Sequence, residues 1–182
     1  MTATEEQPRV LRAPLSLEVA KSLHAGDRVA ITGEVYTARD AAHQRLVDLL
    51  SAGQPLPIEL EGAILYYCGP TPAPPGRVIG SAGPTTSSRM DAYAPLLHAH
   101  GVRATIGKGP RSPTVRAALR EHGAVYLAAV GGVGALLAER VMAAELVAFE
   151  DLGPEALRKL TVEGFPAIVA YDAYGANAFA GD

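Results

Sequence analysis

Cysteine is almost absent from this sequence: Cys68 is the single one among 182 residues. A lone cysteine excludes an internal disulfide and favours a reducing compartment, so we expect a cytoplasmic protein. It also excludes an iron–sulfur cluster held by this chain alone, because such clusters usually take three or four thiolates. Within the apolar run GAILYYCGP, Cys68 is predicted to be a small buried hydrophobic residue and not a nucleophile.

Long apolar runs and a strong net charge are also missing. No stretch approaches the roughly 18 apolar residues of a membrane span, and the acidic start MTATEEQPRV is unlike a signal peptide. A net charge of −3 argues against a nucleic-acid or membrane partner. Hydrophobic residues make up 48%, which is enough for one packed domain. We expect a flexible arm over residues 1–10 and a single domain over residues 11–182.

Strand and helix signals alternate along the second half of the chain, which favours a layered α/β domain. Apolar, β-rich segments predict strands at 15–19, 28–32, 62–68, 77–83, 102–107, 124–130, 145–152 and 165–172. Helical periodicity and capping residues predict helices at 38–52, 90–100 and 154–160, a helix that begins at Pro113, and a turn into a helix over 131–141. Gly53 is a predicted helix stop, and Ser112-Pro113 is a predicted helix start.

The densest polar cluster is GPTTSSRMDAY, residues 83–93. Gly83-Pro84 ends a predicted strand, and Thr85 to Ser88 then lie at a predicted helix N-terminus, whose unpaired N–H groups attract anions. Arg89 adds a planar fork that matches a carboxylate. The alternative is a helix cap beside a solvated arginine, but a cap uses one hydroxyl and leaves the others unexplained. The cluster favours an anion-binding site.

Two further cations follow predicted strands. Arg39 lies in YTARDAAHQR, and Lys108 lies in IGKG, where flanking glycines permit close approach of a ligand. Ligands of open α/β sheets bind at the carboxyl ends of strands, so these cations and Arg89 fit a dicarboxylate if they converge. The alternatives are a surface ion pair of Arg39 with Asp40 and an ordinary turn lysine. His43 lies one turn after Arg39 on the same helix face, and its role stays open.

Several segments, taken in order, resemble one known family: TARDAAH, GPTTSSRMDAYAPLL, IGKG, AVYLAAVGGVGALLA and VEGFPAIVAYDAYGAN. They are similar to the β subunit of class I fumarate hydratase and of L-tartrate dehydratase, and to the C-terminal domain of single-chain class I fumarases. The resemblance runs from about Leu15 to Asn177, and Ser88 departs from it because glycine is common there. It implies an α/β fold: a swivelling β/β/α domain with a mixed sheet and helices packed on it.

The same resemblance implies a hydro-lyase that hydrates fumarate reversibly to L-malate, with L-tartrate or mesaconate as alternative substrates. It implies an α subunit that carries a [4Fe–4S] cluster, not ligated by this chain, whose free iron is a Lewis acid for the substrate hydroxyl. The expected assembly has two subunits of each kind (α2β2).

Site residues are assigned by the resemblance as well. Arg39, Arg89 and Lys108 bind the substrate carboxylates, and Thr85 is the catalytic base. Thr86 is then expected to cap the helix. The remaining alternative is an anion-binding module without a partner, although such a module would not need all four site residues.

Overall fold

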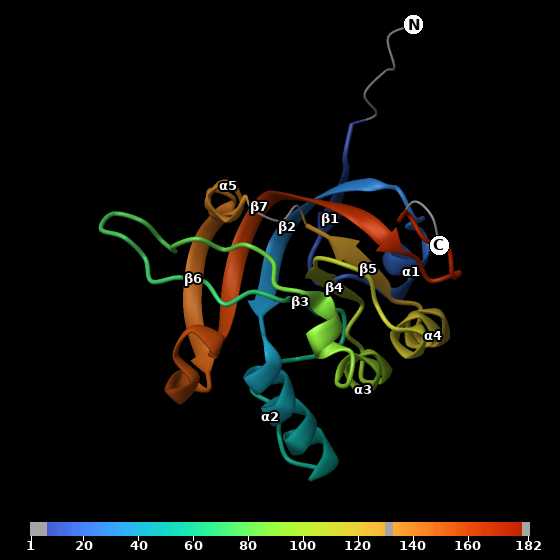
Figure 1. Ribbon diagram of the computed structural model, residues 1–182, viewed down its shortest axis with the longest axis horizontal. Helices are drawn as coiled ribbons and strands as arrows, with labels where there is room; N and C mark the ends of the chain where they lie inside the picture. Colours follow the sequence, from blue (N-terminus) through green and yellow to red (C-terminus); the bar gives the residue numbers. More distant parts are fainter. Residues whose placement is uncertain (1–6, 130–132, 180–182) are drawn as a thin grey trace, which may run out of the picture.

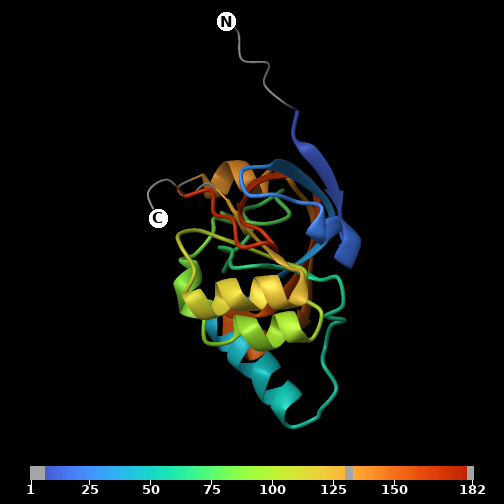
Figure 2. The same cartoon turned by 90° about the vertical axis from the view of Figure 1, so that its right-hand side faces the viewer.

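The computed structural model describes residues 7–129 and 133–179. Its centre is a mixed sheet of seven strands that closes into a barrel, and helices pack on the outside of that sheet (Figure 1 and Figure 2). The predicted α/β class, with a mixed sheet and helices packed on it, is therefore confirmed. Within the described ranges, no helix combines the length and the apolar character that crossing a membrane requires.

The strands are β1 Arg9–Arg12, β2 Arg28–Thr37, β3 Ile64–Tyr66, β4 Ala104–Gly107, β5 Val125–Ala128, β6 Val141–Ala148 and β7 Leu157–Tyr171. The α-helices are α1 Leu17–Lys21, α2 Asp40–Ser51, α3 Ala94–Ala99, α4 Pro113–His122 and α5 Gly134–Ala138. Two 3₁₀-helices, η1 Ser87–Met90 and η2 Glu150–Glu155, complete the described elements.

Parallel pairing joins β1 to β5 in chain order, and the long antiparallel strand β7 closes the barrel. Strand β7 pairs with β2 along one edge and with β6 and β5 along the other. The carboxyl ends of β2, β3 and β4 therefore lie at one rim of the barrel, which is where ligands bind in sheets of this kind.

The core has an inner and an outer part. Side chains such as Ile31, Tyr66 and Phe165 fill the inner cluster, whereas Leu65 and Tyr67 belong to a second cluster beneath α2 and α3. Strand β3 is buried on both faces, as its continuous apolar run indicates. Each large apolar side chain buried in this way contributes on the order of 1.5–3 kcal/mol.

Local capping chemistry explains two helix boundaries that the sequence predicts. Helix α4 begins where the Ser112 hydroxyl accepts a hydrogen bond from the Val115 N–H at 3.3 Å, with Pro113 as the first helical residue. It ends at Gly123, which has the left-handed φ of 65° that favours glycine. After α2, Gly53 has a φ of 64°, so the predicted stop is also confirmed.

Four segments differ from the expectation. The strand expected at 145–152 ends at Ala148, and η2 begins at Glu150. Residues 15–19 are not a strand, because Ser16 caps α1. Residues 77–83 form a loop that is bonded to the proline-rich loop through Thr71, and no strand forms there. Residues from Leu157 onward belong to β7 and not to a helix, because the antiparallel pairing with β2 outweighs the weak helical pattern.

The N-terminal arm is shorter than the sequence predicts. Arg9 and Val10 were expected in the N-terminal arm, but they belong to β1 and pair with Val29 and Ala30. Residues 1–6 lie outside the described residues. The predicted turn at 131–132 also lies outside them, and the helix that follows it, α5, begins at Gly134.

Candidate active site

The four predicted site residues gather at one rim of the barrel. Arg39 follows β2, and Lys108 follows β4. The loop that carries Thr85 and Arg89 lies against the end of β3, because the Thr85 N–H donates to the Tyr67 carbonyl at 2.7 Å. The rim therefore holds three cations and one hydroxyl from three separate parts of the sequence.

Backbone pairing places Thr85 beside Lys108. The Lys108 N–H donates to the Thr85 carbonyl at 3.3 Å, and the Ser87 N–H donates to the Lys108 carbonyl at 2.9 Å. These bonds correct one expectation: the N–H groups of Thr85 and Ser87 are bonded to carbonyls and do not stand free for an anion. Helix η1 is also a single four-residue turn, so the longer helix expected from Met90 begins only at Ala94.

The side chains of this loop remain available. Thr85 is half-buried, Thr86 and Lys108 are exposed, and none of their side chains makes a hydrogen bond or ion pair to the described part of the chain. Thr86 occupies the N-cap position of η1 without a side-chain cap, so its expected capping role is wrong. A free hydroxyl on Thr85 and a free ammonium on Lys108 can therefore both engage a bound molecule.

Each arginine of the rim is held by a carboxylate. The Arg89 Nε donates to Asp40 Oδ2 at 3.1 Å, and the Arg39 Nε lies 3.7 Å from Glu155 Oε1. The alternative considered for Arg39, a surface ion pair with Asp40, does not form, because Asp40 pairs with Arg89 and Arg39 pairs with Glu155. Arg39 Nε, Asp40 Oδ1 and Glu155 Oε1 are buried yet make no hydrogen bond within the described residues. The Arg39 Nε and Glu155 Oε1 face each other as an ion pair that is longer than a hydrogen bond.

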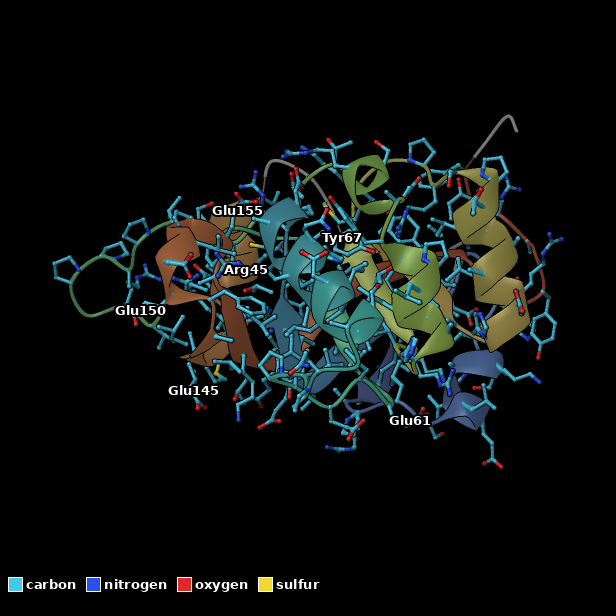
Figure 3. The ribbon with its side chains drawn as sticks, turned by 90° about the horizontal axis from the view of Figure 1, so that it is seen from below. Arg45, Glu61, Tyr67, Glu145, Glu150 and Glu155 are labelled. Atoms are coloured by element: carbon cyan, nitrogen blue, oxygen red, sulfur yellow. The ribbon has the colours of Figure 1, made fainter. Side chains whose placement is uncertain are left out.

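Helix α2 and helix η2 position the Arg39 pair. Arg45 on α2 forms an ion pair with Asp151 on η2, with an Nη1–Oδ1 distance of 2.7 Å. This exposed pair contributes little to the free energy of unfolding. It shows that α2 and η2 lie side by side. Figure 3 shows Glu155 towards the N-terminal end of α2, the end where Arg39 lies.

Gly69 lets the Arg39 side chain approach the loop after β3. A Cβ atom at this position would lie 2.8 Å from Arg39 Nη1 and 2.9 Å from its Cδ. Contacts this short do not occur in proteins, so a larger residue at position 69 would require the Arg39 side chain to shift. Gly69 therefore leaves room for Arg39 to pack against the backbone of this loop.

His43 is a buried neutral histidine beneath the rim. Its Nδ1 lies 2.8 Å from the Arg39 carbonyl, which can only accept, so Nδ1 carries the proton and Nε2 is bare. Burial lowers the pKa of His43 to about 4. The ring packs edge-on against Tyr67 at 5.2 Å, and Figure 3 shows Tyr67 next to α2. His43 therefore supports Arg39 from below and is not exposed to a ligand.

A buried arginine that the sequence interpretation missed supports the same loop. The Arg111 Nε donates to Asp91 Oδ1 at 2.6 Å, and its Nη2 donates to the Tyr67 hydroxyl at 3.2 Å. Asp91 Oδ2 also accepts the Ser112 N–H at 2.7 Å. Arg111 lies in GPRSPT, whose proline and glycine are typical of an exposed loop. The only sign of a charged partner for Arg111 in the sequence is Asp91, near the end of GPTTSSRMDAY.

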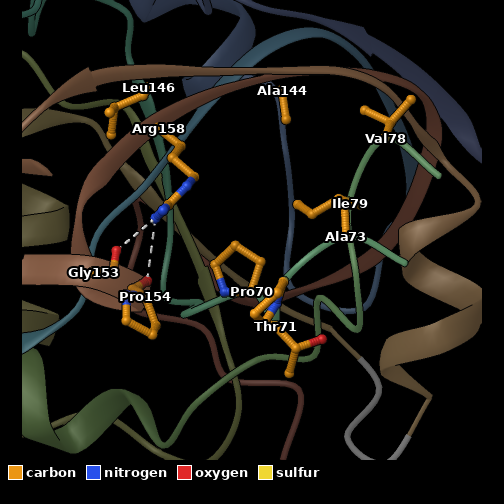
Figure 4. A pocket seen from close by; sticks show the side chains of 11 residues that line it. Pro70, Thr71, Ala73, Val78, Ile79, Ala144, Leu146, Gly153, Pro154 and Arg158 are labelled. Atoms are coloured by element: carbon orange, nitrogen blue, oxygen red, sulfur yellow. Dashed lines mark hydrogen bonds between the residues drawn. The ribbon is translucent and has the colours of Figure 1, made fainter. Parts of the chain in front are cut away.

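The apolar cavity in Figure 4 is separate from these residues. It measures about 420 Å³ and lies between the proline-rich loop and β6. Arg158 is the one charged side chain among its described lining residues, and its Nη1 donates to the Gly153 carbonyl at 3.0 Å. Thr85, Arg89 and Lys108 do not line it. Its lining is mostly apolar.

Among the residues that the structure describes, the donor groups do not fit an iron–sulfur cluster. Cys68 is buried, and burial raises its pKa to about 12, so it is a thiol and not a thiolate ligand. This also confirms that Cys68 packs as a buried residue. Within the described ranges, no group of three histidine, cysteine or acidic side chains could hold a metal ion.

Comparison with known proteins identifies relatives of two lengths. The chain is 42% identical over 154 residues to the anaerobic class I fumarate hydratase of Escherichia coli and 41% identical over 152 residues to fumarate hydratase 2 of Leishmania major. These alignments cover 84% and 82% of this chain but 28% and 27% of the relatives. The chain thus spans about a quarter of their length.

A shorter relative matches along most of its own length. The chain is 39% identical over 167 residues to a provisionally named L(+)-tartrate dehydratase subunit beta of Methanocaldococcus jannaschii, covering 88% of this chain and 86% of the relative. The family model described as Fumarase C-terminus matches residues 2–181. From its rim of cations, its motifs and these matches, this chain belongs to the fumarase C-terminal family.

Proposed function

We propose that this chain is the β subunit of a hydro-lyase that adds water reversibly to fumarate to give L-malate. The observation that carries the proposal is the gathering of Arg39, Thr85, Arg89 and Lys108 at one rim of the barrel. Three cations around one free hydroxyl suit a substrate with two carboxylates and an acidic C–H bond between them. The family matches support the same class of reaction.

The cations bind and orient the substrate in this proposal. Arg89 has a planar fork for one carboxylate, and Lys108 is a mobile point charge for the developing negative charge. Arg39 completes the second carboxylate site. Asp40 and Glu155 hold the two arginines in position before substrate binds.

Thr85 moves the proton. In the dehydration direction the Thr85 oxygen takes the proton from the carbon next to a carboxylate as its own O–H proton passes to a base, and hydration reverses both transfers. A threonine hydroxyl is a weak base, and the single turn of η1 gives little help from a helix dipole. The nearby cations favour the deprotonated hydroxyl. Because no described carboxylate bonds to Thr85, an acidic group of the partner is proposed to accept the proton from it.

The partner in this proposal is an α subunit that carries a [4Fe–4S] cluster. Two observations support a separate subunit: the donor groups here do not suit a cluster, and the chain covers 86% of a relative named as a β subunit. The cluster supplies Lewis-acid chemistry at the substrate hydroxyl when bound. The residues of this chain contribute binding, orientation and the proton.

L-Tartrate dehydration is the second candidate function. It is favoured by the length match to the tartrate dehydratase relative, since the fumarate hydratases are far longer than this chain. The same cations would bind tartrate carboxylates, and the second hydroxyl of tartrate would face the partner. A direct comparison of substrates therefore decides between the two.

The test is anaerobic co-expression with an α subunit that has three cluster cysteines, followed by assays with fumarate, L-malate, L-tartrate and mesaconate. We expect fumarate and L-malate to be turned over fastest. A complex that turned over L-tartrate alone would assign the second function. Turnover of none of these compounds by a cluster-loaded complex would refute the hydro-lyase proposal.

Two neighbouring threonines give a matched pair of variants. Thr85→Ala should lower kcat by about 10²–10⁴-fold, the typical contribution of a general base, and should stop solvent-deuterium exchange at the substrate carbon. Thr86→Ala is the control, because Thr86 is exposed and unbonded. Wild-type exchange in Thr85→Ala would place the base on the partner and leave this chain with carboxylate binding.

A further inference from the structure

The Tyr126 hydroxyl on β5 connects the two loops that carry the candidate site. It donates to the Gly109 carbonyl at 2.8 Å and lies 2.8 Å from Ser87 Oγ. A phenol has one proton, so the Ser87 hydroxyl is the donor in the second bond. Gly109 follows Lys108, and Ser87 lies two residues after Thr85. One oxygen atom thus joins the Thr85 loop to the Lys108 turn.

The space at Gly107 makes this connection possible. A Cβ atom at position 107 would lie 1.9 Å from Ser87 Oγ and 3.0 Å from the Tyr67 ring. Ser87 is fully buried and fills the place that a side chain on residue 107 would take. The serine can reach the Tyr126 hydroxyl only because residue 107 has no side chain.

Arg111 holds the Tyr126 ring in place. Its guanidinium lies 4.9 Å from the Tyr126 ring centre and 5.1 Å from the Tyr67 ring centre. Burial raises the pKa of Tyr126, although the Ser87 hydrogen bond and the Arg111 charge lower it, so the phenol keeps its proton. The protonated Tyr126 phenol therefore donates a hydrogen bond to the Lys108 turn and accepts one from the Thr85 loop.

We infer that Tyr126 is a positioning residue that sets the separation between the Thr85 hydroxyl and the Lys108 ammonium. Two backbone bonds join the same loops, at 2.9 Å between Ser87 and Lys108 and at 3.3 Å between Lys108 and Thr85, and both Tyr126 bonds are 2.8 Å. The phenol therefore adds a side-chain link to a backbone pairing whose bond to Thr85 is long. The link to turnover rests on the function proposed above, and the link between the loops does not.

Tyr126→Phe removes the bridging oxygen and keeps the ring. Tyr171→Phe is the matched control, because Tyr171 stacks on Tyr126 at 5.8 Å and its buried hydroxyl has no hydrogen-bond partner among the described residues. The first measurement is amide hydrogen exchange in the isolated full chain. We expect Tyr126→Phe to accelerate exchange at Ser87 and Lys108 at least tenfold, with the β4 amides unchanged, and Tyr171→Phe to leave all of them unchanged.

The second measurement is kinetics with fumarate in the complex with the α subunit. Tyr126→Phe should lower kcat at least tenfold with KM changed less than threefold, because Arg39 and Arg89 still hold the substrate. Ser87→Ala breaks the same link from the other side, so the double variant should be no slower than Tyr126→Phe. If Tyr126→Phe lowered the melting temperature and left kcat unchanged, the role of Tyr126 would be purely structural.

The exchange measurement tests the positioning role of Tyr126, and the kinetic measurement also tests the proposed hydro-lyase function. Unchanged exchange at Ser87 and Lys108 in both Tyr126→Phe and Ser87→Ala would overturn the positioning role, whatever the activity. The positioning role would also be overturned if the loss of kcat in the double variant equalled the product of the losses in the two single variants. Accelerated exchange in a complex whose wild type turns over no dicarboxylate would support the connection between the loops and refute the proposed function.

Discussion

Replacing His43 with phenylalanine should make the domain less sensitive to acid. His43 is fully buried, its pKa is lowered to about 4 by burial, and its ordinary value is 6.5. The folded state therefore binds the proton less readily than the unfolded state. The neutral imidazole stabilises the fold fully above about pH 6.5, and that stability is lost as the pH falls towards 4.

The magnitude follows from these two pKa values. Between pH 7 and pH 5 the unfolded histidine takes up most of a proton and the folded one takes up almost none, which costs about 2 kcal/mol of unfolding free energy. His98 is also buried, with its pKa lowered to about 4 by burial, and adds a similar loss. The wild type should thus lose about 4 kcal/mol from these two residues over this range.

The assay is urea unfolding followed by circular dichroism at pH 7 and pH 5. Phenylalanine keeps the ring contacts with Tyr67, and the Arg39 carbonyl still accepts the backbone N–H of residue 43 at 2.9 Å. We expect the loss between the two pH values to be about 2 kcal/mol smaller in His43→Phe than in the wild type. Carboxylate titrations are common to both proteins and cancel in the difference.

His100→Phe is the matched control. His100 makes the same hydrogen bond four residues back, to the Leu96 carbonyl at 2.8 Å, but it is exposed. Its replacement should leave the wild-type pH dependence intact. An equal loss of stability in the wild type and His43→Phe would mean that the buried imidazole is not held neutral, and the reasoning would fail.

Three other variants or treatments have defined outcomes. Arg89→Lys should lower kcat/KM of the complex by more than tenfold with the fold intact, because lysine lacks the fork; a smaller fall, below ~1.4 kcal/mol, would remove Arg89 from the substrate site. Gly107→Ala should cost about 1–3 kcal/mol in urea unfolding, because its Cβ would lie 1.9 Å from Ser87 Oγ; unchanged stability would refute that contact. Cys68 should resist iodoacetamide at pH 8 in the folded chain, because burial raises its pKa to about 12; rapid labelling seen by mass spectrometry would contradict its burial.

Features governed by neighbouring residues could be predicted from the sequence. Ser112-Pro113 and Gly53 mark helix boundaries through local capping chemistry, and the apolar run at Ile64–Tyr66 indicates a buried strand. The closure of the barrel depends on β7, whose partners lie far away in the sequence, so the weak pattern around Leu157 could not reveal it. Pairing between distant strands leaves no local signal.

The candidate site shows the same division. Arg39, Arg89 and Lys108 could be found because each follows a strand or a strand-ending Gly-Pro, and parallel strands bring those ends together. Their partners could not be found, because nothing near Glu155 indicates contact with Arg39. Tyr126 gave one usable sign: a tyrosine inside an apolar strand needs a partner for its hydroxyl.

The closure of the barrel by β7 has a consequence for folding during synthesis. Arg28 of β2 pairs with Ile168, and Thr37 pairs with Arg158, so β2 is made long before its partner strand exists. Until β7 emerges, one edge of β2 presents unpaired backbone groups, which are a template for pairing with other chains. Such non-local pairing also slows folding. A nascent chain that stalled before Leu157 would therefore be prone to aggregate until the C-terminal strand is complete.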